Sequence, residues 1–181
     1  AIYTPALHAQ LPRSSGRNGP SRDGVTGANT NSARLVAKIA TSSSEATGTF
    51  TSATSLIVVV YRPKAGYTLS WGAVAASTGA STTVSYAALS IAAGSGVAAF
   101  AGHRSTNTAL ETPPAGMVLR ATVADATDEA AAFDTNGPVT SWGGASVSVG
   151  GTSSGWRSAV VEIVAAAAVT ARPTFQAFII D

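Results

Sequence analysis

The stretch TSWGGASVSVGGTSSGWRSAVVEIV, residues 140–164, decides the fold expected for this chain. Residues 145–149 alternate small and β-branched side chains, and residues 156–164 form a second apolar stretch that begins with Trp156. Only Gly, Thr and Ser lie between them, and these residues favour a turn. Two strand-like stretches joined by such a loop are typical of a β-hairpin. The sequence therefore predicts a hairpin at the centre of an all-β domain.

Short strands separated by turns continue through the remainder of the chain. The run SLIVVVYR at residues 55–62 is continuous and β-branched, which suits a strand that is buried on both faces or paired centrally. Residues 82–91 alternate in the manner of a strand, although SYAALSIAA is also compatible with a short helix. Further strands are expected at residues 34–41, 49–53, 67–76, 97–103, 117–123, 130–133 and 174–180. About ten short strands predict an antiparallel β-sandwich or barrel.

Residues 1–33 differ from this pattern. They include Pro5, Pro12 and Pro20, which interrupt any helix, and a stretch rich in Gly, Ser, Asn and Arg without a hydrophobic period. Charge is uneven as well: residues 1–38 carry five basic side chains and one acidic one, whereas residues 39–181 carry six basic and eight acidic. We therefore expect an extended N-terminal arm over residues 1–33 and a β-sandwich domain over residues 34–181.

Composition excludes several classes of site. The chain of 181 residues has no cysteine, so Cys-ligated zinc, iron–sulfur clusters and thiol nucleophiles are excluded. A domain of this length can bury a sizeable core without disulfides. Its longest apolar run, residues 163–169, is far shorter than the ~20 residues that span a bilayer. The N-terminus lacks a basic region followed by an apolar core, so synthesis in the cytoplasm is expected.

Two groups of polar residues are candidates for a catalytic site or a metal site. A Ser–His–Asp triad could be drawn from Ser105, His103 and Asp134, but no G-x-S-x-G elbow supports it, and we expect no enzymatic activity. The carboxylates of Asp125, Asp128 and Glu129 cluster in one turn. Asp134, Asn136 and Gly137 resemble a fragment of a calcium loop that lacks its terminal Glu. We expect solvated turns there, with no metal and no cofactor.

The three tryptophans, Trp71, Trp142 and Trp156, allow two interpretations. They could form a platform on which sugar rings stack, as in a glycan-binding module. Alternatively they are packing residues, because large aromatic side chains supply much of the burial in a small domain. Trp142 and Trp156 flank the predicted hairpin, so we expect them to pack against each other or against the sheet.

The arm carries its own candidate binding residues, Tyr3, Arg13, Arg17 and Arg22. Nucleic acid is not expected as a partner, because its binding sites have denser basic patches, often interleaved with aromatic residues. An acidic surface on a protein partner suits the arm better, since extended segments gain affinity by covering a large area.

Several stretches resemble virion proteins of tailed bacteriophages. They are similar to the jelly-roll, lectin-like sandwich modules of two kinds of such proteins: capsid decoration proteins, and accessory proteins associated with the head or tail. The stretches are SATSLIVVVYRP (residues 52–63), AFAGHRSTN (99–107), TPPAGMVLR (112–120), FDTNGPVTSW (133–142) and GWRSAVVEI (155–163). At position 117, where such proteins often have a bulkier aromatic residue, this chain has Met117.

The resemblance implies a structural role in a virion and carries no catalytic residues over. It implies that the chain decorates or stabilises the capsid, or occupies a tail-associated position. Its arm would dock on neighbouring subunits, with the major capsid or tail protein as partner. A homo-oligomer, with a trimer as one option, is expected, and no membrane association. A glycan-binding receptor or adhesion module of a phage head or tail is the alternative.

Overall fold

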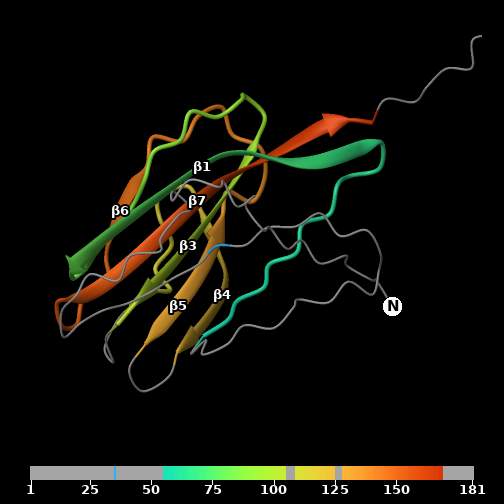
Figure 1. Cartoon of the computed structure of the whole chain (residues 1–181). Coiled ribbons are helices and arrows are strands. Elements are labelled where there is room, and N and C mark those ends of the chain that lie inside the picture. Colours follow the sequence, from blue (N-terminus) through green and yellow to red (C-terminus); the bar gives the residue numbers. More distant parts are fainter. Residues whose placement is uncertain (1–34, 36–54, 105–108, 125–127, 169–181) are drawn as a thin grey trace, which may run out of the picture.

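The computed structural model describes residues 35, 55–104, 109–124 and 128–168. Within these ranges the chain forms strands and connecting segments but no helix (Figure 1). The strands are β1 (Tyr67–Ser81), β2 (Thr83–Tyr86), β3 (Gly96–His103), β4 (Val118–Ala124), β5 (Glu129–Asp134), β6 (Ala145–Ser148) and β7 (Ser154–Ala167). The prediction of an all-β chain is therefore confirmed for the described residues. Residues 82–91 contain β2 and no helix.

The strands form two antiparallel sheets. Five strands pair in the order β1-β7-β3-β5-β4, and β2 pairs with β6 in a second sheet. The long strand β7 is hydrogen-bonded on both sides, to β1 and to β3. Beyond the last β3 pair, Gly96 with Ile163, β1 and β7 continue alone as a ribbon that ends at the pair Tyr67 and Ala167.

The predicted hairpin of residues 145–164 is wrong, because β6 and β7 lie in different sheets. Val147 of β6 pairs with Val84 of β2, whereas Trp156 of β7 pairs with Gly79 and His103. The sequence between the strands is a turn, as expected, and both Gly150 and Gly151 have positive φ. That turn carries the chain from one sheet to the other.

The reason for this crossing lies at the residue that follows β6. The amide of Val149 donates to the carbonyl of Thr82, and its own carbonyl accepts from Ala109. Both backbone groups are therefore bound to segments far away in the sequence, and neither is available to pair with β7. Local pattern indicated two strands and a turn, but these distant partners decide which sheet each strand joins.

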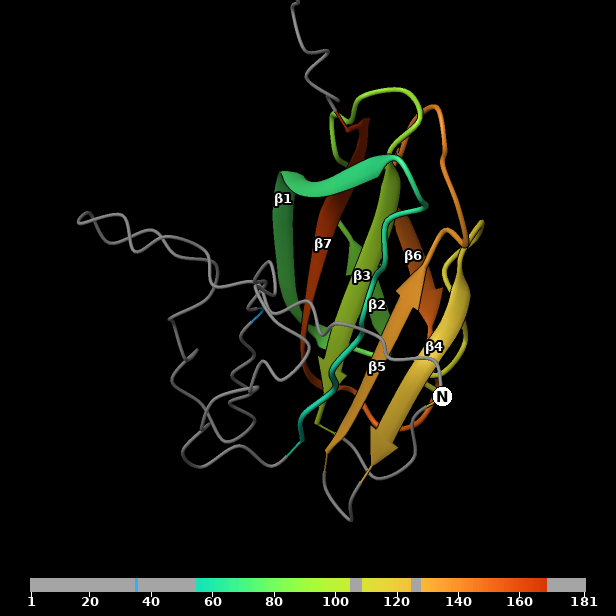
Figure 2. The ribbon, with the colours of Figure 1, turned by 90° about the vertical axis from the view of Figure 1, so that its right-hand side faces the viewer.

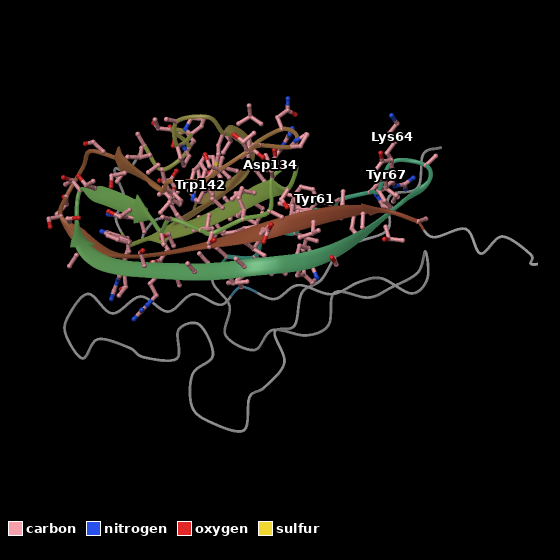
Figure 3. All side chains as sticks on the ribbon, turned by 90° about the horizontal axis from the view of Figure 1, so that it is seen from above. Tyr61, Lys64, Tyr67, Asp134 and Trp142 are labelled. Atoms are coloured by element: carbon pink, nitrogen blue, oxygen red, sulfur yellow. The ribbon has the colours of Figure 1, made fainter. Side chains whose placement is uncertain are left out.

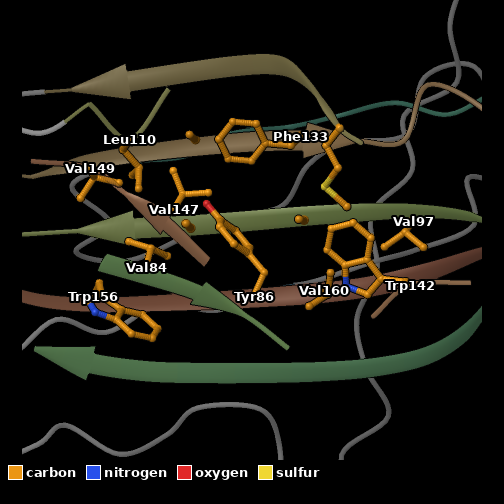
Figure 4. Packing of buried hydrophobic residues seen from close by; sticks show 14 of the residues in the cluster. Val84, Tyr86, Val97, Leu110, Phe133, Trp142, Val147, Val149, Trp156 and Val160 are labelled. Atoms are coloured by element: carbon orange, nitrogen blue, oxygen red, sulfur yellow. The ribbon is translucent and has the colours of Figure 1, made fainter. Parts of the chain in front are cut away.

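The two sheets share one hydrophobic core, seen close by in Figure 4. Phe133 of β5 is fully buried, and its ring contacts Tyr86 of β2 edge to face, with centroids 6.0 Å apart. Such contacts add to the free energy gained by burying the rings. The Ser158 hydroxyl of β7 donates to the Ser85 carbonyl of β2 at 2.6 Å and ties the sheets together.

A second, smaller cluster lies on the opposite side of the five-stranded sheet, which we call the outer face. Ala98, Val161 and Ile163 are buried there. Partly buried residues from β1, β3 and the preceding chain pack against them: Leu35, Tyr61, Leu69, Trp71, Val74 and Phe100. The outer face is therefore apolar and partly covered rather than fully solvated.

Residues 55–62, which we call the outer segment, cross this face in front of β3 and β5 (Figure 2). The prediction of a strand here is wrong: the outer segment belongs to neither sheet. The strands beneath it offer no free edge at this position, because β3 and β5 each have a hydrogen-bonded neighbour on both sides. It gains burial by lying on top of the sheet instead.

Of the other predicted elements, the strand at 49–53, the terminal strand at 174–180 and the arm at 1–33 fall outside the described residues, as does the strand at 34–41 apart from Leu35.

Candidate functional site

Trp142 and Trp156 face the core. They are 7% and 5% exposed, and Figure 4 shows them at opposite ends of the cluster rather than against each other. Both indole N–H groups are used inside the fold, Trp142 donating to the Ala87 carbonyl and Trp156 to the Ser81 hydroxyl. The ring of Trp156 lies over Gly79, where a Cβ atom would be only 2.5 Å from it. Packing therefore explains both residues, and neither ring forms a surface platform for a sugar.

Trp71 is placed differently, on the outer face. It is partly buried in the second cluster, and its indole N–H is buried without a hydrogen-bond partner. A glycan contact by Trp71 stays a prediction. The platform of three rings that the sequence allowed is not assembled, because the rings lie on two sides of the five-stranded sheet.

His103 is fully buried at the end of β3. Its Nε2 lies 3.0 Å from the Ser81 carbonyl, which can only accept, so Nε2 carries the proton. Nδ1 is buried and has no partner. In the β3–β5 register, Asp134 faces Ala98, five residues from His103 and about 17 Å away. His103 and Asp134 therefore cannot belong to one triad, and Ser105 lies outside the described residues.

Asp134 is held in an ion pair on the outer face. Arg120 donates from Nε and Nη2 to its two carboxylate oxygens, both at 2.7 Å, and also reaches the Asn136 side-chain oxygen at 2.6 Å. The amide of Asn136 donates to the same carboxylate at 2.7 Å. Asn136 has a φ of 53° and Gly137 one of 146°, which confirms the predicted turn. The fragment that resembled a calcium loop is thus a turn whose carboxylate is already neutralised.

Among the described residues, no group of three or more His, Asp or Glu side chains could hold a metal ion. Asp125 lies outside them, and Glu129 is not in a solvated turn as expected but faces inward from β5. The inward position follows from strand alternation, because Glu129 lies on the same side as Ala131 and Phe133.

Glu129 is paired with a second carboxyl group, that of Glu111. Burial, followed by a hydrogen bond and charge repulsion from Glu111, raises the pKa of Glu129 to about 7, while the backbone N–H of Leu110 acts in the opposite direction. Leu110 itself is fully buried in the core. The pair therefore joins the loop before β4 to β5, and it is held together best when one carboxyl carries a proton. No local pattern points to Glu111, because its partner is 18 positions away in the sequence.

This pair predicts stability that falls as pH rises. In the unfolded chain Glu129 ionises near its ordinary pKa of 4.5, whereas in the folded chain it retains its proton up to about 7. The folded state therefore binds more protons between these values, and up to about 3 kcal/mol of its stability is lost across the window. Thermal melting between pH 4.5 and 8 measures this loss. Glu129→Gln should flatten the profile, and an unchanged slope in that variant would contradict the assignment.

Glu162 is a second buried carboxylate that sequence reasoning missed. It accepts hydrogen bonds from the Ser95 hydroxyl at 2.6 Å, the Ala92 amide at 2.8 Å and the Ala73 amide at 2.9 Å. These bonds, led by that from Ser95, lower the pKa of Glu162 against the opposing effect of burial. The carboxylate thereby ties β7 to β1 and to the segment before β3.

The same carboxylate explains an irregularity in β1. The register with β7 shifts between Trp71 and Val74, and Ala73 lies in that bulge. Gly72 leaves room for the Glu162 side chain, since a Cβ atom at this position would collide with Oε2. The bulge also reverses the alternation of β1, so that Trp71 and Val74 both lie on the outer face.

Within the described surface, the outer segment exposes large apolar side chains and backbone groups without partners. Leu56 and Val58 are 51% and 42% exposed, whereas Ile57 and Val59 between them are partly buried against the protein. Within the described chain, no backbone hydrogen bond is made by residues 55–62. An extended apolar segment with free backbone groups is a site for pairing with another strand.

Tyr61 anchors one end of the outer segment. Its ring packs on the second cluster, and its hydroxyl is buried near the Asp134 carboxylate. Burial raises the pKa of Tyr61, and the nearby Asp134 carboxylate adds to the increase. In Figure 3, Tyr61 lies between Asp134 and the end of the β1–β7 ribbon, where Lys64 and Tyr67 are found. The Ser55 hydroxyl, at the other end of the segment, is buried and has no hydrogen-bond partner.

The arm residues Tyr3, Arg13, Arg17 and Arg22 lie outside the described residues. In the described part of the chain no helix is long and apolar enough to cross a membrane. Comparison with protein-family descriptions, with curated proteins and with solved structures found no match for this chain.

Proposed function

We propose that this chain is a non-enzymatic structural protein of a phage-like virion. Its β-domain is a jelly-roll-like sandwich that decorates or stabilises the capsid or occupies a tail-associated position, and its N-terminal arm docks on neighbouring subunits. The protein is made in the host cytoplasm and resides in the virion, with the major capsid or tail protein as partner. The virion setting rests on the sequence resemblance.

The observation that carries an assembly role is the outer segment. Leu56 and Val58 are the two most exposed large apolar residues of the segment, and its backbone groups have no partner in the described chain. A chain that acts alone in water gains nothing from displaying such a segment. A subunit that associates with other subunits can bury it. The sparse charge, at 11% of residues, suits the same role, because charged residues are depleted at the centres of interfaces.

Removal of the arm tests the docking part of the proposal. A variant lacking residues 1–30 should bind virus particles depleted of this protein far more weakly than the full chain, because each arm contributes contact area that many copies multiply. Co-sedimentation with the particles measures binding. A triple variant, Arg13→Ser, Arg17→Ser and Arg22→Ser, keeps the arm length and isolates its charge. Undiminished binding by the truncated chain would remove the docking role.

The alternative function, glycan binding, has less support than an assembly role. The described structure offers no observation in its favour, since Trp142 and Trp156 lie in the core.

A further inference from the structure

Leu110 attaches the chain between β3 and β4 to the core. Its side chain is fully buried in the same cluster as Val149 (Figure 4). The amide of Ala109 donates to the Val149 carbonyl at 2.6 Å, whereas the bond from Thr112 to Ala109 is internal to residues 109–112. Among the described residues, the bond to Val149 is the only backbone-to-backbone bond that joins 109–112 to another part of the chain. These four residues, which we call the Leu110 segment, are therefore held at few points.

Two prolines fix the far end of the Leu110 segment. Pro113 and Pro114 follow it directly, and their rings restrict rotation of the backbone. Pro114 is fully buried, and its carbonyl accepts from the amide of Met117, whose side chain is also in the core. Any movement of the segment therefore ends at Pro113, and the chain beyond it stays in place.

A carboxyl pair supplies the other attachment of the segment. Glu111 is exposed, whereas Glu129 faces inward from β5 and is 9% exposed. The hydrogen bond between them requires a proton on one carboxyl, because two carboxylates have no donor to share. When both are ionised, that bond is replaced by repulsion between like charges. The same pair therefore holds the segment in one protonation state and opposes its position in the other.

The neighbouring strands place one titratable side chain, that of His103, opposite Glu129. The His103 ring extends away from β5 and across β7, because its Nε2 lies 3.0 Å from the Ser81 carbonyl at the end of β1. On the other side of Glu129, the opposing residue of β4 is Ala124, which has no charge. Residues 149–153, which follow β6 near Leu110, are uncharged as well. None of these described elements supplies a counter-charge in place of the shared proton.

Two further charged residues lie close by in the sequence, Arg104 after β3 and Asp128 before β5. Each takes part in an interaction within the fold. Apart from burial, the groups with the largest effects on Glu129 are the Glu111 carboxyl and the backbone N–H of Leu110. Both groups belong to the Leu110 segment, so the charge of Glu129 is coupled to the position of that segment.

We propose that the Leu110 segment is a pH-sensitive element, which is closed on the core while the Glu111–Glu129 pair holds a proton and opens when both carboxyls are ionised. Opening breaks the bond from Ala109 to Val149 and withdraws Leu110, which uncovers apolar surface without unfolding either sheet. This inference goes beyond the proposed function and is independent of the virion setting.

The direction of the response follows from the protonation of Glu129. Its pKa is about 7 in the closed state and returns toward its ordinary value of 4.5 when the side chain is exposed to water. The closed state therefore binds the proton more tightly, and opening becomes more favourable as pH rises between these two values. Above about pH 7 both states are ionised, and the effect levels off.

Hydrogen exchange at two amides tests the opening, because they are bound on opposite sides of Val149. The amide of Ala109 donates to the Val149 carbonyl, and the amide of Val149 donates to the Thr82 carbonyl, outside the segment. After correction for intrinsic rates, protection of Ala109 should fall by about ten- to a hundredfold between pH 5 and pH 8. At each pH, Ala109 should be at least about tenfold less protected than Val149. Low concentrations of urea should accelerate exchange at Val149 but hardly at Ala109, since a local opening exposes little surface.

Glu129→Gln separates the carboxyl pair from other effects of pH. The introduced amide can donate to the Glu111 carboxylate and accept from the N–H of Leu110 at any pH, so protection of Ala109 should no longer fall. Asp128→Asn alters the neighbouring carboxyl, and this matched control should keep the fall. Circular dichroism at both pH values establishes that the variants are folded.

Three results would overturn the opening: protection of Ala109 that does not change with pH, equal protection and equal urea dependence at Ala109 and Val149, or the same fall in Glu129→Gln as in the original chain. The second result would mean that the domain unfolds as a whole. It would keep the pH-dependent stability described above and remove the local opening.

Discussion

Replacing Glu162 with alanine is expected to lower the free energy of unfolding by about 3–5 kcal/mol. The substitution removes the acceptor of three hydrogen bonds: one from the buried Ser95 hydroxyl, and two from the amides of Ala73 and Ala92, which are partly buried. A buried donor without a partner costs about 1–3 kcal/mol, and water entering the vacated space recovers part of the total. Urea denaturation monitored by tryptophan fluorescence measures the loss.

The control for this substitution is Thr122→Ala, which removes one exposed hydrogen bond to Ala130 and should change stability by less than about 0.5 kcal/mol. A loss of that small size in Glu162→Ala would show that the carboxylate is not holding β7 to β1. Gly72→Ala gives an independent check. It should be destabilising alone and much less so in the Glu162→Ala background, because the side chain that a Cβ would meet has been removed.

Replacing Phe133 with alanine is expected to cost about 3–5 kcal/mol, in contrast to a loss of about 1–2 kcal/mol for Phe100→Ala. The two residues lie on neighbouring strands and face opposite sides of the five-stranded sheet. Phe133 is fully buried and contacts the ring of Tyr86 in the other sheet, so its removal leaves a cavity. Phe100 is only partly buried, and the outer face around it can relax.

Thermal or urea unfolding of the two variants measures this difference. The comparison tests whether the core shared by the two sheets, rather than the outer face, carries most of the stability. Equal losses of stability would mean that the outer face is packed as tightly as the core. That result would weaken the argument that the outer segment becomes buried only on association with another subunit.

Elements that depend on local pattern were predicted well. β3 and β4 lie within one residue of the strands expected at 97–103 and 117–123, because alternation along a strand determines which residues face the core. The turn at Asn136 and Gly137 was predicted for a similar reason: these residues tolerate positive φ.

Candidate sites were predicted less well, since each depends on residues that only the fold brings together. Glu129 was expected in a solvated turn, yet it lies in β5 and its carboxyl group contacts that of Glu111, in the loop before β4. Glu162 lies in an apolar stretch, and its three donors come from segments 67 to 89 residues away. No spacing of residues in the sequence predicts either arrangement.

By itself, the sequence determined that the described part of this chain is built from strands and turns, and that Gly150 and Gly151 reverse the chain between β6 and β7. The tertiary structure alone decided that these two strands belong to different sheets and that the β-branched residues 55–62 pair with no strand of the described chain. The physical reason is that propensity and alternation are properties of neighbouring residues. Strand pairing, in contrast, uses backbone N–H and C=O groups that can bind any of several segments distant in the sequence.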